Sequence, residues 1–177
     1  PAQILFPKTL NELKSIVATS SKIRVVGGAH SFNSQIATKE TLLDLKHMNQ
    51  IKIDVGNKLA RVGGGAKVRQ VMHETLKNNF VVAGFGGGTH AQSASGAIST
   101  NLHGAQKRIF AQNVLEMSVV LANATSVTLT KKDDLFHLVK SGMGEFGIIY
   151  EVVLEIFPRT CYEMQCIQEN IQNSINF

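Results

Sequence analysis

Two glycine-rich stretches have the residue types that bind phosphate groups. The first covers residues 27–33 (GGAHSFN), directly after an apolar segment, and the second covers residues 84–89 (GFGGGT), followed by a polar stretch over residues 93–104. Glycines let the backbone approach a ligand, so that several N–H groups point at one anion, and Ser or Thr hydroxyls add further donors. The pattern predicts a pyrophosphate site, although tight turns in a β-rich domain are the alternative interpretation.

The sequence lacks the motifs of other common nucleotide-binding loops, of metal sites and of side-chain catalysis. Residues 65–68 (GAKV) have no hydroxyl residue after the lysine, so they form no Walker loop, and neither glycine stretch has the Gly-x-Gly-x-x-Gly pattern that opens a helix. His47, His73 and His137 have no partnering carboxylates at metal-ligand spacing, so no metal site is expected. No Ser/His/Asp arrangement and no paired carboxylates accompany the glycine stretches, so a cofactor must supply any chemistry.

The segments around the first glycine stretch predict a mixed α/β lobe over residues 1–85. Thr9 and Glu12 form a capping-box pattern ahead of a helix, and residues 22–26 read as a strand that ends at the loop. Strands are expected over 51–55 and 59–62, joined by a turn at residues 56–58, followed by a helix from Val68 to Leu76 and a strand over 80–83.

A second α/β lobe is expected over residues 86–158. It comprises strands over 115–121 and 126–130, a helix that begins at Asp133 or Asp134 and ends at Gly142, and a final strand over 147–157. The polar tail over 159–177 is expected to be the stub of a further domain. The fold class predicted is therefore α+β, with mixed sheets flanked by helices.

The composition of the chain limits the kinds of binding partner and the cellular location that can be expected. The chain has 177 residues, 44% of them hydrophobic, and a formal net charge of +5, but its basic residues are scattered and it has no Trp, which disfavours a nucleic-acid interface. No apolar run is long enough for a membrane span and no signal peptide opens the chain, whose first residue is Pro rather than Met. Cys161 and Cys166 form no CxxC pair, which favours a reducing, cytoplasmic location. The Pro at position 1 favours a trimmed N-terminus.

Four blocks carry a resemblance to a known family. They are residues 23–33 (IRVVGGAHSFN), 43–49 (LDLKHMN), 95–104 (SGAISTNLHG) and 142–149 (GMGEFGII). In order and spacing, across residues 7–158, they resemble the PCMH-type FAD-binding domain of the vanillyl-alcohol oxidase superfamily, and most closely its sugar-lactone and alditol oxidase branch.

The resemblance implies a two-lobed flavin domain with FAD extended between the lobes and its pyrophosphate on the first glycine loop. In that branch the loop histidine holds the flavin through its 8α-methyl carbon, and His30 stands at the matching position; an imidazole nitrogen is nucleophilic enough at neutral pH for this role, while a hydrogen-bonding role alone is the alternative. No Cys lies between Phe80 and Gly104, so a second covalent link through that region is excluded. The resemblance places these residues at the cofactor: Gly27, Gly28, Ala29, His30, Ser31, Phe32, Ser93, Gly96, Ala97, Ser99, Thr100, His103, Gly104, Gly147 and Ile148.

The resemblance also implies an activity. Relatives in that branch oxidise an alcohol, alditol or sugar lactone by hydride transfer to flavin N5, and their substrate-facing groups come from a C-terminal domain. No catalytic residue is therefore expected in this chain, and the sequence gives no oligomeric state. A non-catalytic module that binds FAD or another nucleotide is the alternative function.

Overall fold

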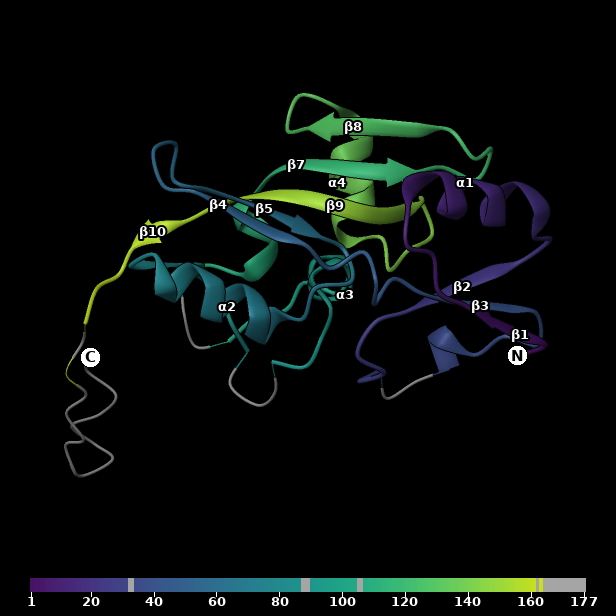
Figure 1. Ribbon diagram of the computed structural model, residues 1–177, viewed down its shortest axis with the longest axis horizontal. Coiled ribbons are helices and arrows are strands. Elements are labelled where there is room, and N and C mark those ends of the chain that lie inside the picture. The colour runs from purple at the N-terminus through teal and green to yellow at the C-terminus, as the bar shows by residue number, and fades with distance from the viewer. Residues whose placement is uncertain (32–33, 87–89, 105–106, 162, 164–177) are drawn as a thin grey trace, which may run out of the picture.

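The computed structural model describes residues 1–31, 34–86, 90–104, 107–161 and 163. Two main sheets organise them (Figure 1). The smaller sheet has the order β1-β3-β2 and the larger has the order β4-β5-β9-β7-β8, with a short antiparallel pair, β10-β6, beside it. Helices accompany both sheets, so the predicted α+β class is confirmed.

The smaller sheet is parallel and carries the first glycine loop. Strand β3 (Thr41–Asp44) pairs with β1 (Gln3–Leu5) on one side and with β2 (Ile23–Val26) on the other. Parallel strands need a crossover connection, and helix α1 (Leu10–Thr19) provides it between β1 and β2. The glycine loop therefore begins at the carboxyl end of a parallel strand, where ligands commonly bind in α/β units.

Helix α1 begins at Thr9, whose hydroxyl accepts a hydrogen bond from the Glu12 backbone N–H at 3.2 Å. The Glu12 carboxylate accepts from the backbone N–H of Lys8 at 2.8 Å, one residue before the position that a complete capping box requires. The predicted box is therefore corrected to a Thr9 cap with a displaced partner. The apolar face of α1 buries Leu13 completely.

The larger sheet is antiparallel, with β9 (Ile148–Glu155) at its centre. The predicted hairpin forms from β4 (Ile51–Asp54) and β5 (Leu59–Gly63), and β5 pairs along β9. On its other side β9 pairs with β7 (Val114–Val120), which forms a hairpin with β8 (Ser126–Thr130). This sheet takes strands from both sides of residue 85, so a lobe boundary there does not coincide with a boundary between sheets, and the division into lobes stays a prediction.

Helices α2 (Val68–Lys77), α3 (Ala94–Ser99) and α4 (Asp134–Ser141) contribute buried residues to the main core with the larger sheet. The 3₁₀ turns η1 (Ser34–Ile36) and η2 (Phe110–Asn113) and strands β6 (Phe80–Val81) and β10 (Phe157–Pro158) complete the described elements. No helix among the described residues has the length and apolar character needed to cross a bilayer.

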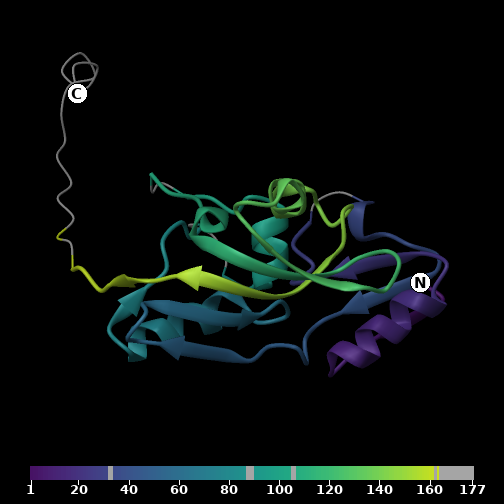
Figure 2. The same cartoon turned by 90° about the horizontal axis from the view of Figure 1, so that it is seen from above.

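A second, smaller core joins the two sheets. Leu13 of α1, Leu43 of β3 and Leu45, which follows β3, pack with Val120 at the end of β7, and all four side chains are buried. Figure 2 shows β9 and β10 running lengthwise, so that β10 lies at the end of the molecule opposite the N-terminus. The small core around Val120 holds the parallel sheet, and with it the glycine loop after β2, against the larger sheet.

Candidate functional site

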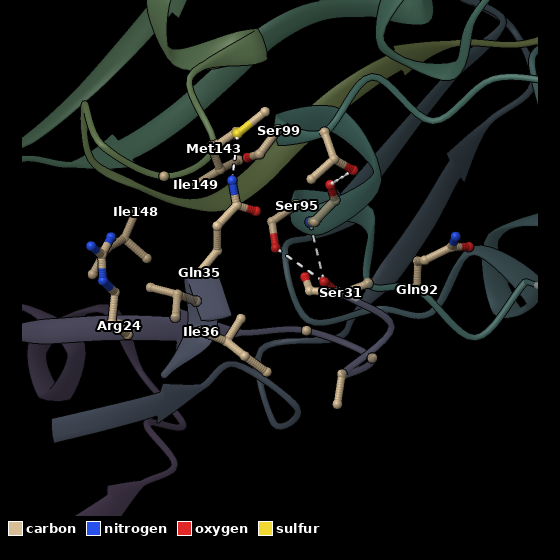
Figure 3. Close-up of a pocket in the computed structure, with 18 of the residues that line it drawn as sticks. Arg24, Ser31, Gln35, Ile36, Gln92, Ser95, Ser99, Met143, Ile148 and Ile149 are labelled. Carbon is tan, nitrogen blue, oxygen red and sulfur yellow. Dashed lines mark hydrogen bonds between the residues drawn. The ribbon is translucent and has the colours of Figure 1, made fainter. Parts of the chain in front are cut away.

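A cavity of about 470 Å³ lies where the first glycine loop meets α3 and the start of β9 (Figure 3). This volume is within the range of small-molecule sites. Its lining has apolar residues of β2 and β9 and polar residues of the glycine loop and α3, and among the described residues it contains no Asp or Glu, which suits an anionic ligand. The lining residues are Ile23, Arg24, Val25, Gly27, Gly28, Ala29, His30, Ser31, Gln35, Ile36, Gln92, Ser93, Ser95, Gly96, Ser99, Thr100, Met143, Gly144, Gly147, Ile148 and Ile149.

The first glycine loop packs its backbone directly onto the segment before α3. A Cβ atom at Gly27 would overlap the Ser93 hydroxyl, and one at Gly28 would overlap the Ala91 carbonyl oxygen. Ala29 has φ 56°, a left-handed conformation that favours glycine. The close approach therefore requires glycine at residues 27 and 28, and Ala29 adopts the turn at some cost.

The loop presents unused donors to the cavity. Within the described part of the chain, the backbone N–H groups of Gly28, Ala29, His30 and Ser31 donate no hydrogen bond to protein. Successive free N–H groups in a turn form an anion-binding concavity. His30 belongs to the same lining and is exposed, so a ligand in the cavity has access to this residue.

Helix α3 supplies the facing wall. Ser93 is its N-cap, with its hydroxyl accepting from the Gly96 N–H at 3.2 Å, and the Ser95 hydroxyl donates to the Gly64 carbonyl at 2.9 Å. Thr100 closes the helix by donating to the Gly96 carbonyl at 2.8 Å. These bonds fix a row of small polar residues opposite the glycine loop.

Two contacts join the walls at the other end of the cavity. The Arg24 guanidinium on β2 lies 2.6 Å from the Glu145 carboxylate, and the Gln35 amide of η1 lies 2.8 Å from the Met143 sulfur. Figure 3 shows Gln35 reaching across to Met143, with Arg24 and Ile148 nearby. A further hollow of about 350 Å³ shares Arg24, Gln35 and Met143 with the first, which lengthens the cleft.

The structure brings most of the expected site residues together. Eleven of them line the cavity: Gly27, Gly28, Ala29, His30, Ser31, Ser93, Gly96, Ser99, Thr100, Gly147 and Ile148. Three do not. The Ala97 side chain is buried in the core, His103 is exposed away from the lining, and Gly104 packs on the Phe85 carbonyl. Phe32 lies outside the described residues.

Residues that the sequence did not single out also line the cavity. Arg24, Ser95 and Met143 stand inside the quoted blocks, so their position beside the predicted residues was an available signal. Gln35, Ile36 and Gln92 carry no such signal, because the folding of η1 and of the segment before α3 places them there. The Gln92 side-chain oxygen is buried and has no hydrogen-bond partner in the described part of the chain.

These features fit FAD. An extended dinucleotide needs central donors for its pyrophosphate, which the free N–H groups provide, and apolar walls for a ring, which Ile23, Val25 and Ile148 provide. The unpartnered Gln92 oxygen is an acceptor for a ligand hydroxyl or N–H group. No group of His, Cys, Asp and Glu suited to a metal ion occurs among the described residues.

Comparison with known proteins agrees with this class of site. A sequence profile of the FAD-binding domain family matches residues 1–130, and the chain belongs to this family. A putative D-arabinono-1,4-lactone oxidase from Neurospora crassa is 26% identical over 167 residues, covering 89% of this chain and 30% of its own length. The mitochondrial L-galactono-1,4-lactone dehydrogenase of Brassica oleracea is 27% identical over 162 residues, covering 86% of this chain and 27% of its own length.

Solved structures share the fold. Glucooligosaccharide oxidase from Acremonium strictum, which is described with a 6-S-cysteinyl, 8α-N1-histidyl FAD, superposes with a TM-score of 0.79 at 26% identity, covering 89% of this chain and 35% of its own. The 6-hydroxy-D-nicotine oxidase of Arthrobacter nicotinovorans has a TM-score of 0.79 at 21% identity, covering 88% of this chain and 36% of its own. The chain thus spans about a third of these proteins. The expected cytoplasmic location stays a prediction, since one relative is mitochondrial.

Proposed function

We propose that this chain is the FAD-binding part of an oxidoreductase that acts on the CH–OH group of an alcohol, alditol or sugar lactone, and that His30 attaches the flavin covalently. The observation that carries the proposal is the run of free N–H groups in the His30 loop, opposite the hydroxyl-lined face of α3. The family match supports FAD, and the lactone-oxidising relatives support the substrate class.

The chain's own residues divide the work of binding. The N–H groups of residues 28–31 hold the pyrophosphate from one side, and the hydroxyls of Ser93 and Ser99, at the two ends of α3, are the further donors on the other side. Residues 147 and 148 offer backbone groups to the adenine. When bound, FAD supplies the hydride-accepting N5 atom, which no side chain of the cavity replaces.

His30 belongs to the same lining as these groups and is an exposed residue. In the attachment, a ring nitrogen of His30 forms one N–C bond to the flavin 8α-methyl carbon. The imidazole would lose its N–H proton and the methyl group would lose one C–H proton. The two electrons released pass to oxygen or another acceptor, which balances the step. Substrate-binding groups are expected outside this chain.

The visible spectrum before and after acid precipitation tests both parts. We expect the purified protein to be yellow and the flavin to stay with the precipitate, and we expect His30→Ala to release it into the supernatant. His47→Ala is the matched control, because His47 is an exposed histidine that contacts Phe6 and does not line the cavity. Complete release from the wild-type protein contradicts covalent attachment but leaves FAD binding intact. A colourless protein that takes up no added FAD contradicts the whole proposal.

The activity is tested in the full-length gene product. Anaerobic addition of an aldonolactone or alditol is expected to bleach the oxidised flavin band. No bleaching with any alditol, aldonolactone or hydroxy acid contradicts the proposed reaction while leaving the cofactor site in place.

A further inference from the structure

Lys67 connects the two segments that line the cofactor cavity, although it does not line the cavity itself. It precedes α2, and its ammonium nitrogen lies 3.3 Å from the carbonyl oxygen of Gly27, the first residue of the glycine loop. Its backbone forms an isolated antiparallel bridge with Ser93, the N-cap of α3. One residue thus contacts both walls of the proposed pyrophosphate site from behind.

The helix that follows gains little from a lysine at this position. An N-cap residue normally accepts hydrogen bonds through a short side-chain oxygen, and Lys67 makes no side-chain cap bond. A positive charge there also opposes the helix dipole. The first N–H groups of α2 are already used, because Val68 donates to the Gln92 carbonyl and Arg69 to the His90 carbonyl, both at 2.9 Å. Lys67 therefore breaks a local rule, as residues at functional sites often do.

The charge of Lys67 has no acidic partner. In the described ranges, no carboxylate lies within ion-pair distance of its ammonium group, which is half-buried. Arg24, the cation that lines the cavity, is paired with Glu145. An unpaired and partly desolvated cation beside an anion-binding loop favours an anionic ligand there.

The hydrogen bond to Gly27 also orients the loop. In a trans peptide unit the C=O and the following N–H point in opposite directions. The structure has no cis peptide bond among the residues that it describes. Holding the Gly27 carbonyl toward Lys67 therefore turns the Gly28 N–H away from Lys67, which lies behind the loop, and toward the cavity that Gly28 lines.

We propose that Lys67 is the positioning residue of the pyrophosphate site: its ammonium group fixes the Gly27–Gly28 peptide so that the Gly28 N–H faces the diphosphate, and it supplies positive charge behind the loop. This inference rests on the proposed FAD-binding function. The ligand chemistry it requires is a diphosphate ester, so a nucleoside diphosphate without a flavin ring contains the necessary group.

The test separates binding from stability. ADP carries the diphosphate but no flavin ring. So that no bonded FAD occupies the site, wild-type and variant residues at position 67 are compared in the His30→Ala background after removal of FAD, and calorimetric titration gives the ADP affinity directly. We expect Lys67→Ser to bind ADP about tenfold more weakly, the typical loss for one charge-assisted contact. We expect the unliganded variant to melt at the wild-type temperature or above it, because serine is a better N-cap. Lys67→Arg is expected to keep the affinity within about threefold, since it retains the charge.

Two further measurements exclude a merely structural role. Added NaCl is expected to weaken ADP binding by wild type more steeply than by Lys67→Ser, because screening acts on the charge. Lys52→Ser is the matched control: Lys52 is an exposed lysine of β4 that is absent from the cavity lining, and this variant is expected to bind ADP like wild type.

Equal ADP affinity of wild type and Lys67→Ser overturns the inference, and it leaves the proposed function standing if wild type still binds FAD. A loss of melting temperature in Lys67→Ser that accounts for the weaker binding, with no rescue by arginine, also overturns it. Failure of the wild-type protein to bind either FAD or ADP overturns both proposals.

Discussion

Gly28 has little room for a side chain within the cofactor loop, so Gly28→Ala is a direct test of the site's geometry. An added Cβ would overlap the Ala91 carbonyl oxygen, and it would lie 3.0 Å from the carbonyl carbon of Ala91 and 2.9 Å from Cδ2 of His30. The Ala91 segment cannot easily retreat, because its neighbours His90 and Gln92 accept hydrogen bonds from the first turn of α2. The glycine loop itself must therefore move.

The cost follows from this clash. Forcing one extra carbon into a closely packed backbone contact costs about 1–3 kcal/mol. For a chain of 177 residues, a mid-range value of about 2 kcal/mol corresponds to a fall in melting temperature of about 4–8 °C. The shifted loop would also misalign its free N–H groups, and losing two hydrogen bonds of about 1 kcal/mol each weakens FAD binding about 30-fold.

In the His30→Ala background, from which FAD can be removed, thermal melts without cofactor and fluorescence titration with FAD measure the two effects separately. Gly56→Ala is the matched control, because a Cβ there would meet only the Asp54 carboxylate at an ordinary 3.6 Å. We expect this control to change neither quantity measurably. If Gly28→Ala melts and binds FAD like wild type, the packing of the loop against Ala91 is wrong.

Two other predictions concern the scaffold. Asn113 is fully buried, and its amide donates to the Ala83 carbonyl at 2.8 Å and to the Phe110 carbonyl at 2.9 Å. Asn113→Ala is therefore expected to lower the free energy of unfolding in urea by about 2 kcal/mol. A change below about 0.5 kcal/mol would contradict this account. Hydrogen bonds from the Thr130 backbone N–H and then from its hydroxyl lower the pKa of Asp133 from its ordinary 3.8. A lowered folded-state pKa contributes stability above the unfolded value, and that contribution is lost as the pH falls below it. The melting temperature of Asp133→Ala is therefore expected to lie below that of wild type at pH 7, and the gap is expected to shrink as the pH falls below 3.8, whereas a gap that does not change with pH refutes the linkage.

Local signals in the sequence identified most of the elements but not their arrangement. The turn at residues 56–58 and the alternation around it predicted the β4–β5 hairpin, and Gly142 marked the end of α4. Neither signal contains the pairing of β5 with β9, which joins Gly63 to Glu151. Such non-local registers depend on the packing of whole faces, so no local pattern predicts that one sheet takes strands from both halves of the chain.

The candidate site shows the same division. The glycine loop could be predicted because its close backbone packing requires glycine, a residue type that is visible in the sequence. Gly27 and Gly28 stand where the loop comes closest to Ser93 and Ala91. Ala97 is buried and absent from the lining because the six-residue helix buries one face, while Gly96 and Ser99 line the cavity. Gln35 reached the cavity only through the reversal of the chain at η1, for which no local pattern stood out.

The cavity lies at the junction between the two main sheets, so a bound ligand stabilises their relative placement. One wall is the glycine loop of the parallel sheet, and the other belongs to α3 and to β9 of the larger sheet. The described contacts between the two sides include an exposed ion pair between Arg24 and Glu145 and the small core around Val120. An exposed ion pair contributes at most about 1 kcal/mol. A ligand that touches both walls binds the folded arrangement alone and stabilises it by mass action, by about 2.7 kcal/mol at a concentration 100 times its Kd. Bound FAD would therefore stabilise the placement of the two sheets more than the Arg24–Glu145 pair does.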